Sequence, residues 1–506
     1  LVYSALNDTT GVIKPFKKYV GKAKFRFHLA TIDPSGNPTR GITRRFTYLT
    51  FGGDDQAKMD QWSPANYYNI WFENVIGRAI AGGTILAYAT LPPSSATFPF
   101  YDGVICAYPY INFENTVEHE TGHYFNLYHP WNSSGGGAGE LCGDDEVDDT
   151  PPTKGHYSTC PLYDTACATN YYKLYTSASG TDSLVNYPDT TNVQNIMDYS
   201  SCVNMFTKGQ VTRMHAAINS TVADRFNLWQ ADNLAATGAL NTHPDIKPVT
   251  DFVVRATSNS ASQFAFFTFP GVSTYITNKS WQDTVVRIDW TFPSDATPSS
   301  FAATVSSTIS APLAVTFNTP GWVTFTMADS GNHTGTTTTT YNDRIFVAEK
   351  NGINPDGYLQ EFDPSGDRAK WPMFNYYNNE FKWEIANTGM YDNYSLKYNG
   401  YDTRVTPFSS PFTGTPLGDY DDFFTIPVDL SSLSAGSAYL NFFYSAASRS
   451  SNSLDITDTL LIDYSVAKTQ TWVNVAKLAK STLINKGSLA FPYAPTNISD
   501  WAAKAI

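Results

Sequence analysis

The segment VEHETGHYFNLYHP, residues 117–130, holds three of the chain's eight histidines, and their spacing constrains the local fold. His119 and His123 are four residues apart, so on a helix both lie on one face and can bind one metal ion. Glu120 lies beside them, where its carboxylate can hold a water molecule that the metal polarises. A His-x-x-x-His pair alone is also typical of a surface or core pair, so a third ligand decides between the two interpretations.

The third histidine fits only if the helix ends soon after His123. On a continued helix, His129 would lie about 15 Å along the axis from His119 and roughly 80° off its face. Asn126 is where the chain must turn, because asparagine is second only to glycine in tolerating left-handed backbone angles. Pro130 prevents a helix from resuming. The sequence therefore predicts a helix, a sharp turn and three histidine ligands for one metal ion.

His-Glu-x-x-His-x-x-Gly-x-x-His is the zinc motif of the metzincins, and HETGHYFNLYHP resembles the pappalysin (cytophagalysin) branch, with Asn126 in place of the usual glycine. Five further segments resemble that branch in the same order: residues 21–45, 67–77, 102–108, 142–153 and 195–214. The resemblance covers roughly residues 20–225. It implies an α+β metzincin catalytic domain that hydrolyses peptide bonds. Zinc would be bound by His119, His123 and His129, with Glu120 as general base.

Four of the five cysteines, Cys142, Cys160, Cys167 and Cys202, follow the histidine motif in a loop-rich stretch. A second metal site is an alternative, but no C-x-x-C pair is present. Disulfides are favoured, and they indicate an oxidising, extracellular setting. The pairing in pappalysins implies Cys142–Cys167 and Cys160–Cys202. Cys106 lies in an apolar run and is expected to be a buried, inert thiol.

The acidic run GDDEVDDT, residues 143–150, is typical of a solvated loop and equally of a calcium site. Pappalysins carry calcium in this region, so the resemblance favours a structural calcium ion. The candidate ligands are Asp144, Asp145, Asp148 and Asp149.

The segment NIMDYS, residues 195–200, resembles the Met-turn of the family. The resemblance implies that Met197 forms a hydrophobic floor below the zinc, and that Tyr199 directs its phenol at the developing oxyanion. The spacing to Cys202 is two residues shorter than usual and lacks the acidic residue that pairs with Arg or Lys of a substrate. We therefore predict an uncharged residue after the scissile bond. The histidines His28, His156 and His215 are interpreted as incidental.

The 506 residues are enough for several domains. We predict an irregular lead-in over 1–20, the catalytic domain over 21–230 and a linker over 231–248. Short alternating runs predict an immunoglobulin-like or PKD-like sandwich over 249–350 and a jelly-roll-like sandwich over 355–506. Within these domains, strands are predicted at 23–32, 104–111, 285–293, 311–329, 343–350, 438–446, 459–465 and 471–478, helices at 113–128 (with Asn115 as N-cap) and 206–226, and a helix followed by a strand at 61–80.

The net charge of −13 argues against nucleic acid and anionic membranes as partners. No apolar run approaches the ~18 residues that span a bilayer. The start at Leu1, without a signal-like segment, is interpreted as a processed form. We expect a secreted monomer that acts on protein or peptide substrates, with β modules that attach it to a surface or glycan. The alternative is a non-catalytic adhesin or carbohydrate-binding protein that kept a metalloprotease-like domain. The presence of Glu120 and all three histidines favours the enzyme.

Overall fold

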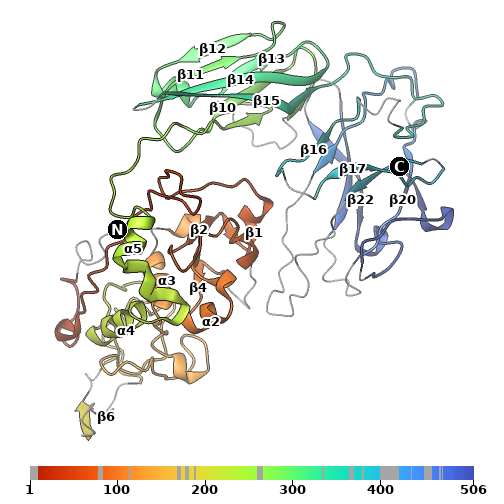
Figure 1. The fold of residues 1–506 in the computed structure, drawn as a ribbon. Coiled ribbons are helices and arrows are strands. Elements are labelled where there is room, and N and C mark those ends of the chain that lie inside the picture. Colours follow the sequence, from red (N-terminus) through yellow and green to blue (C-terminus); the bar gives the residue numbers. More distant parts are fainter. Residues whose placement is uncertain are drawn as a thin grey trace. The chain divides into compact units, whose positions relative to one another are not determined.

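The structure, a computed structural model, describes most of the chain (Figure 1). It falls into two compact units that meet in sequence between Pro244 and Asp245. Each unit is described by itself. The described residues are 9–77, 84–111, 113, 115–167, 190–258, 266–332, 335–363, 370–378, 381–391, 393–398, 400, 421–434, 436–448, 458–466, 469, 471–489 and 491–506, together with the paired strands β6 (Tyr172–Thr176) and β7 (Asp182–Asn186).

The N-terminal unit contains a small mixed sheet in the order β2 (Ile70–Glu73), β5 (Val104–Ala107) and β4 (Ala87–Ala89). Strand β5 is parallel to β2 and antiparallel to β4. Its four residues are all buried, which explains why the sequence reads as a continuous apolar run. Cys106 lies within it as a buried free thiol, as predicted. A second parallel pair joins β1 (Phe51–Gly53) to β3 (Val75–Ile76).

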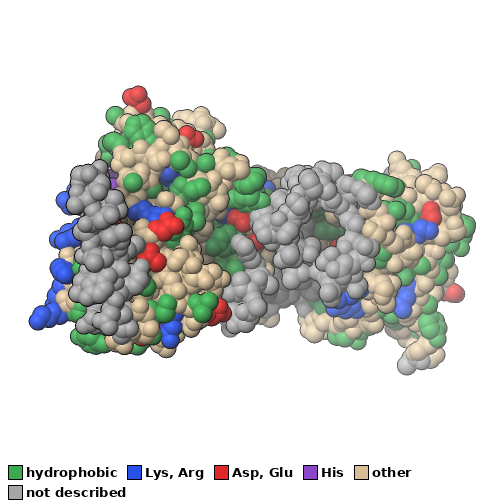
Figure 2. Space-filling view, turned by 90° about the horizontal axis from the view of Figure 1, so that it is seen from below, with side chains coloured by type: hydrophobic (Ala, Val, Ile, Leu, Met, Phe, Trp, Pro, Cys, Tyr) green, Lys and Arg blue, Asp and Glu red, His purple; other side chains and the backbone are tan. Residues whose placement is uncertain are grey.

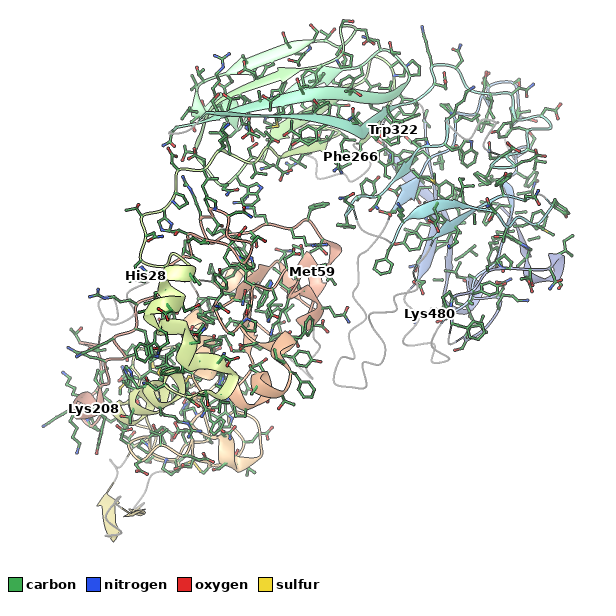
Figure 3. The ribbon with its side chains drawn as sticks, viewed as in Figure 1. His28, Met59, Lys208, Phe266, Trp322 and Lys480 are labelled. Atoms are coloured by element: carbon green, nitrogen blue, oxygen red, sulfur yellow. A yellow bond between two sulfur atoms is a disulfide. The ribbon has the colours of Figure 1, made fainter. Side chains whose placement is uncertain are left out.

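Two helices form the core of this unit, α3 (Thr116–Tyr124) and α4 (Lys208–Ile218). Helix α4 begins with a capping box, in which Thr207 and Gln210 each accept a hydrogen bond from the other's backbone N–H. Lys208, its first residue, is labelled in Figure 3. The core between the helices consists of Tyr124, Phe125, Leu127, Ile196, Met197, Val203, Phe206, Met214 and Ala217. The shorter helical segments of the unit are Lys17–Tyr19, Tyr48–Thr50, Asp55–Ala57, α2 (Pro92–Thr97), Pro99–Tyr101, Tyr108–Tyr110, Asn132–Ser134, η7 (Val222–Trp229) and α5 (Ala231–Ala236).

Several predicted elements differ in the structure. Residues 61–69 form turns and extended chain in place of a helix, and the strands follow at β2 and β3. Residues 23–32 form no ladder strand, and Lys24 has a left-handed φ of 57°. Their alternation arises because Phe25 and Phe27 pack against Phe125, while His28 is exposed (Figure 3). The helix predicted over 206–226 ends at Ile218.

The first part of the predicted linker, 231–248, belongs to the N-terminal unit. Residues Ala231–Ala236 form α5, and the Asn233 side chain donates to the carbonyl oxygen of Asn66 at 3.0 Å. These contacts were hidden from the sequence because Asn66 is far away along the chain.

In the second unit, two sheets share one core; one is antiparallel and the other is antiparallel except at one edge strand. One has the order β13 (Leu313–Thr316), β10 (Ser273–Asn278), β8 (Phe252–Arg255). The other has β12 (Ser300–Ala303), β11 (Val285–Thr291), β14 (Gly321–Gly331), β15 (Thr336–Val347) and the parallel edge strand β9 (Phe267–Thr268). Alternate residues of β14 are buried, and Val254, Ile276 and Val315 of the first sheet join Trp290, Phe325 and Ile345 of the second. The two sheets therefore form a sandwich, with the short helix α6 (Ser306–Ile309) beside it.

The remainder of the second unit is built from two-stranded ladders among the described residues. They are β16 (Met373–Phe374) with β19 (Asp422–Phe423), β17 (Trp383–Ala386) with β18 (Ser395–Tyr398), β20 (Asn441–Tyr444) with β23 (Ala502–Ala505), and β21 (Thr459–Ser465) with β22 (Trp472–Ala479). Single helical turns occur at Lys480–Thr482 and Ile498–Asp500. Phe374 and Phe424 share an aromatic cluster with Phe267 of the sandwich, and Trp322 and Phe266 pack against it (Figure 3). The strands match the prediction, while the jelly-roll-like arrangement stays a prediction.

The charge of the chain is unevenly distributed. Figure 2 shows lysine and arginine side chains along one edge of the N-terminal unit, although the net charge is −13. In the part of the chain that the structure describes, no helix has the length and apolar character of a membrane-spanning segment.

Candidate active site

Helix α3 ends in the turn that the histidine spacing predicts. Asn126 has a φ of 69°, in the left-handed region. Leu127 N donates to Gly122 O, and Asn126 N donates to His123 O, both at 2.9 Å. This pair of bonds is a Schellman motif, which satisfies carbonyl groups at the end of a helix. The turn sends the chain back so that His129 reaches the other two histidines.

The three imidazoles converge on one point. Nε2 of His129 lies 3.2 Å from Nε2 of His119 and 3.1 Å from Nε2 of His123. Among the described residues, these three histidines are the group of three or more His, Cys, Asp or Glu side chains close enough to bind one metal ion, and their ligand atoms all lie within 4.8 Å of one another. Three protonated rings this close would repel one another. The geometry therefore suits three neutral imidazoles that act as metal ligands.

The opposite nitrogens of two rings are held by backbone carbonyl groups. Nδ1 of His119 lies 2.7 Å from Ile196 O, and Nδ1 of His123 lies 2.8 Å from Leu127 O. A carbonyl can only accept, so each Nδ1 carries the hydrogen and each Nε2 keeps its lone pair for a metal. The ring of His129 stacks on Trp131 with 4.7 Å between centroids.

Burial keeps these histidines neutral. It lowers the pKa of His119 to about 3 and that of His123 to about 4, with the charge of His123 adding to the effect on His119. The pKa of His129 is also lowered well below its ordinary value, first by burial and then by the other two histidines. Neutral imidazole is the form that binds zinc, so the residues present fit a zinc ion.

Glu120 is buried next to the histidines, with 7% of its surface exposed. Its Oε2 atom has no hydrogen-bond partner among the residues that the structure describes. Burial raises the pKa of this carboxyl group to about 8, although a backbone hydrogen bond with Ala89 of β4 opposes the shift. A buried carboxylate with one free oxygen can accept a proton from a bound water molecule.

Residues 195–200 bring Met197 and Tyr199 to the same site. Met197 is fully buried, and a Cβ at Gly122 of α3 would lie too close to its thioether sulfur, so a larger residue at Gly122 would require Met197 to move. The phenol oxygen of Tyr199 lies 2.9 Å from Nε2 of His129. Burial raises the pKa of Tyr199 above its ordinary value, which keeps the phenol protonated. Met197 and Tyr199 thus both lie beside the histidine cluster, and their roles in a Met-turn stay a prediction.

Both disulfides implied by the family resemblance are present, Cys142–Cys167 and Cys160–Cys202, each with 5.7 Å between Cα atoms. Asn115 precedes α3 as predicted, but it is not a side-chain N-cap. Its φ of 58° directs the side chain away, and Nδ2 donates to Val203 O at 2.9 Å.

The acidic run is attached to helix α4. Asp145 is buried and accepts hydrogen bonds from Gln210 Nε2 and Val147 N, both at 3.1 Å. Asp149 accepts a hydrogen bond from Gly209 N in the first turn of α4 at 2.9 Å. A carboxylate at this end of a helix also interacts favourably with the helix dipole. Asp144 accepts from Glu146 N, and Asp148 is exposed. These carboxylates do not converge at ligand spacing in the described part of the chain, so a calcium site formed by them stays a prediction.

Two residues that support the site could not be identified from the sequence. Arg213 of α4 donates from Nε to Asn126 O at 2.8 Å, and its guanidinium lies 4.3 Å from the ring centre of Tyr128. It thus holds the turn that returns His129. His156, interpreted as incidental, is buried and bonded to Asp198 and Asp164. Both sets of contacts join residues distant in sequence.

A buried carboxylate beside three converging imidazoles is the side-chain set of a metal-dependent hydrolase. Comparison with known proteins agrees. Residues 52–219 match the family model of peptidase M43, described as pregnancy-associated plasma protein-A. An extracellular metalloprotease of Pyricularia oryzae is 35% identical over 147 residues, covering 27% of this chain and 44% of that protein. One from Colletotrichum graminicola is 31% identical over 179 residues, covering 33% and 55%.

The chain thus spans about half the length of these curated relatives. Mature mirolysin of Tannerella forsythia, solved in complex with a cleaved peptide, is 28% identical in sequence. The structural match covers 45% of this chain and 82% of the mirolysin chain, with a TM-score of 0.34. The N-terminal unit contains a metalloprotease domain of the metzincin type. Residues 52–219 of this unit are similar to the pappalysin family, peptidase M43.

Proposed function

We propose that this chain is a secreted zinc endopeptidase. The observation that carries the proposal is the orientation of the histidines: two of the three rings have Nδ1 tied to a carbonyl group, and all three direct Nε2 at one point beside Glu120. His119, His123 and His129 would hold the ion. Zinc, when bound there, polarises a water molecule and the carbonyl group of the scissile peptide bond.

Glu120 acts as the general base and then as the general acid. Its free Oε2 accepts a proton from the attacking water, and the same carboxyl group delivers that proton to the nitrogen of the leaving amine. Burial raises the pKa of this carboxyl group, which favours its holding the proton between the two steps. Tyr199 donates a hydrogen bond from its phenol to the oxyanion that develops on the substrate carbonyl.

The substrate is a protein or peptide with an uncharged residue after the scissile bond. Ser200 and Ser201 occupy the positions before Cys202, and the Ser200 hydroxyl already donates to Val193 O at 2.5 Å. Asp198 is the nearest acid in sequence, but it is 3% exposed and bonded to His156, so it cannot pair with a substrate cation. A lysine or arginine would then be buried without a partner, which costs several kcal/mol.

Secretion and calcium binding complete the proposal. Two disulfides suit an oxidising compartment, and the curated relatives are named extracellular metalloproteases. The calcium ion rests on the family resemblance. Attachment of the second unit to a glycan or surface, and a monomeric state, are parts of the same proposal.

The test uses the full chain. Casein or gelatin cleavage is measured before and after dialysis against a chelator and after zinc is added back, with zinc content determined in parallel. We expect cleavage that disappears on chelation and returns with zinc. His129→Ala should lose both zinc and activity, while His28→Gln, at an exposed site, should lose neither. Stoichiometric zinc without cleavage of any protein substrate would favour the adhesin alternative.

A further inference from the structure

His156 occupies an unusual position for a histidine outside the zinc site. Its side chain is 4% exposed, and each ring nitrogen faces a carboxylate. Nδ1 lies 2.9 Å from Asp198 Oδ2, and Nε2 lies 3.0 Å from Asp164 Oδ2. A neutral imidazole can donate from one nitrogen only, so with both carboxylates ionised the two contacts are hydrogen bonds when the ring is doubly protonated.

The environment supports the doubly protonated form. Burial raises the pKa of Asp198, but the charge of His156 and two backbone N–H bonds to Asp198 Oδ1, from His156 at 2.9 Å and from Tyr199 at 2.7 Å, act in the opposite direction and favour the ionised carboxylate. Burial lowers the pKa of His156, but the hydrogen bonds and charges of Asp198 and Asp164 outweigh burial and raise it. In the described part of the chain, these two are the charged groups that act on His156, while Lys154 acts on Asp164.

The same contacts hold Tyr199 by its backbone. Its N–H donates to Asp198 Oδ1, and its carbonyl oxygen accepts from Ser158 N at 2.9 Å. Both partners belong to, or are held by, the segment that carries His156. On the far side, Asp164 is anchored because its carbonyl oxygen accepts from Thr191 N at 2.8 Å. His156 therefore links the turn that carries Tyr199 to an independently fixed loop.

We propose that His156 is a positioning residue. Its doubly protonated ring bridges Asp198 and Asp164 and so holds the Tyr199 phenol beside His129. This inference rests on the proposed peptidase function for its catalytic consequence. Loss of the ring proton would place a lone pair against a buried carboxylate, which loosens the turn and misplaces the phenol. His156 touches neither substrate nor zinc ligand in this role; it acts through Asp198.

The test is a double-mutant cycle with a pH profile. His156→Gln keeps a donor of similar size but removes the charge, and it should lower kcat about tenfold, as expected when one oxyanion donor is misplaced. In a Tyr199→Phe background, the same change should lower kcat less than about twofold, because the phenol is already absent. The matched control, His28→Gln, should leave kcat unchanged in both backgrounds.

Asp164→Asn supplies a second, milder variant. The amide oxygen can still accept the Ala166 N–H bond that Asp164 Oδ1 accepts at 2.9 Å, so folding should be retained even if His156→Gln does not fold. Removing one neighbouring carboxylate should move the alkaline fall of kcat to lower pH by about one unit. An unchanged profile would overturn the proposal, as would equal fold-losses for His156→Gln with and without the Tyr199 hydroxyl.

NMR separates this proposal from the peptidase function. The ring signals of His156 are assigned by their loss in His156→Gln, and they should report protonation of both nitrogens at pH 7. If the wild-type chain cleaves no substrate but the ring is doubly protonated, the peptidase proposal fails and the bridge stands. A neutral ring at pH 7 would refute the bridge whatever the activity.

Discussion

The Nδ1 atom of His123 lies 2.8 Å from the carbonyl oxygen of Leu127, the residue that follows the turn at Asn126. The turn therefore does two things at once: it returns His129 to the site, and it fixes which nitrogen of His123 faces the metal. This relationship makes the backbone conformation of Asn126 a determinant of metal binding.

The effect of a substitution at Asn126 on zinc binding should depend on whether the new residue tolerates the left-handed φ, and not on the chemistry of its side chain. With φ at 69°, Asn126→Gly removes the Cβ strain and should preserve zinc binding, whereas Asn126→Val should destabilise the fold by about 1–2 kcal/mol. Zinc affinity by competition with a chromophoric chelator, and urea unfolding, measure both effects. Equal zinc affinity in the two variants would show that the turn does not position His129.

A buried ion pair beside α3 should be essential for stability. Arg225 and Asp102 form two hydrogen bonds, at 2.8 and 2.6 Å, and both are almost fully buried. Asp102→Ala leaves the buried guanidinium charge without an ionic partner and should lower the free energy of unfolding by about 3–5 kcal/mol.

The matched control is the exposed pair Arg45–Asp60, whose side chains are 46% and 51% exposed. Asp60→Ala should change the free energy of unfolding by less than about 1 kcal/mol. Similar losses in the two variants would mean that burial of the Arg225 pair is not what matters.

Glu73 should make the protein less stable as the pH rises. Burial, and then the charges of Asp54 and Asp55, raise its pKa from 4.5 to about 9. Between these values the folded state binds a proton that the unfolded state has released, so the free energy of unfolding falls with increasing pH. Glu73→Gln, which cannot ionise, should gain stability over wild type at pH 8 and little at pH 4. Denaturant unfolding at both pH values decides, and a gain that is the same at both would contradict the assignment.

The primed-side preference is tested by digestion of a peptide library. We expect cleavage before small or apolar residues, because Ser200 and Ser201 replace an acid and Asp198 is bound by His156. A dominant Arg or Lys after the scissile bond would show that another carboxylate lines the pocket.

Local rules predicted the end of the helix and the convergence of the three histidines, but not the contacts that support them. The helix, the turn at Asn126 and the three histidines follow from positions a few residues apart, where helix geometry and backbone preference decide the outcome. The pairing of cysteines and the placement of Tyr199 came from family resemblance. The helix expected in the first part of 61–80 did not form, because the side chain of Asn69 bonds the backbone of Trp62 across a turn: it accepts from Trp62 N at 3.1 Å and donates to Trp62 O at 2.7 Å. Arg213 and His156 have partners that only the folded chain brings together.

Glu120→Ala provides the most direct test of the central claim, that zinc and a glutamate base hydrolyse peptide bonds at this site. The variant keeps all three histidines, so zinc content should remain near one ion per chain. Removal of the base should lower turnover on a peptide substrate by at least about 10³-fold. Turnover at the wild-type level in zinc-loaded Glu120→Ala would contradict the account.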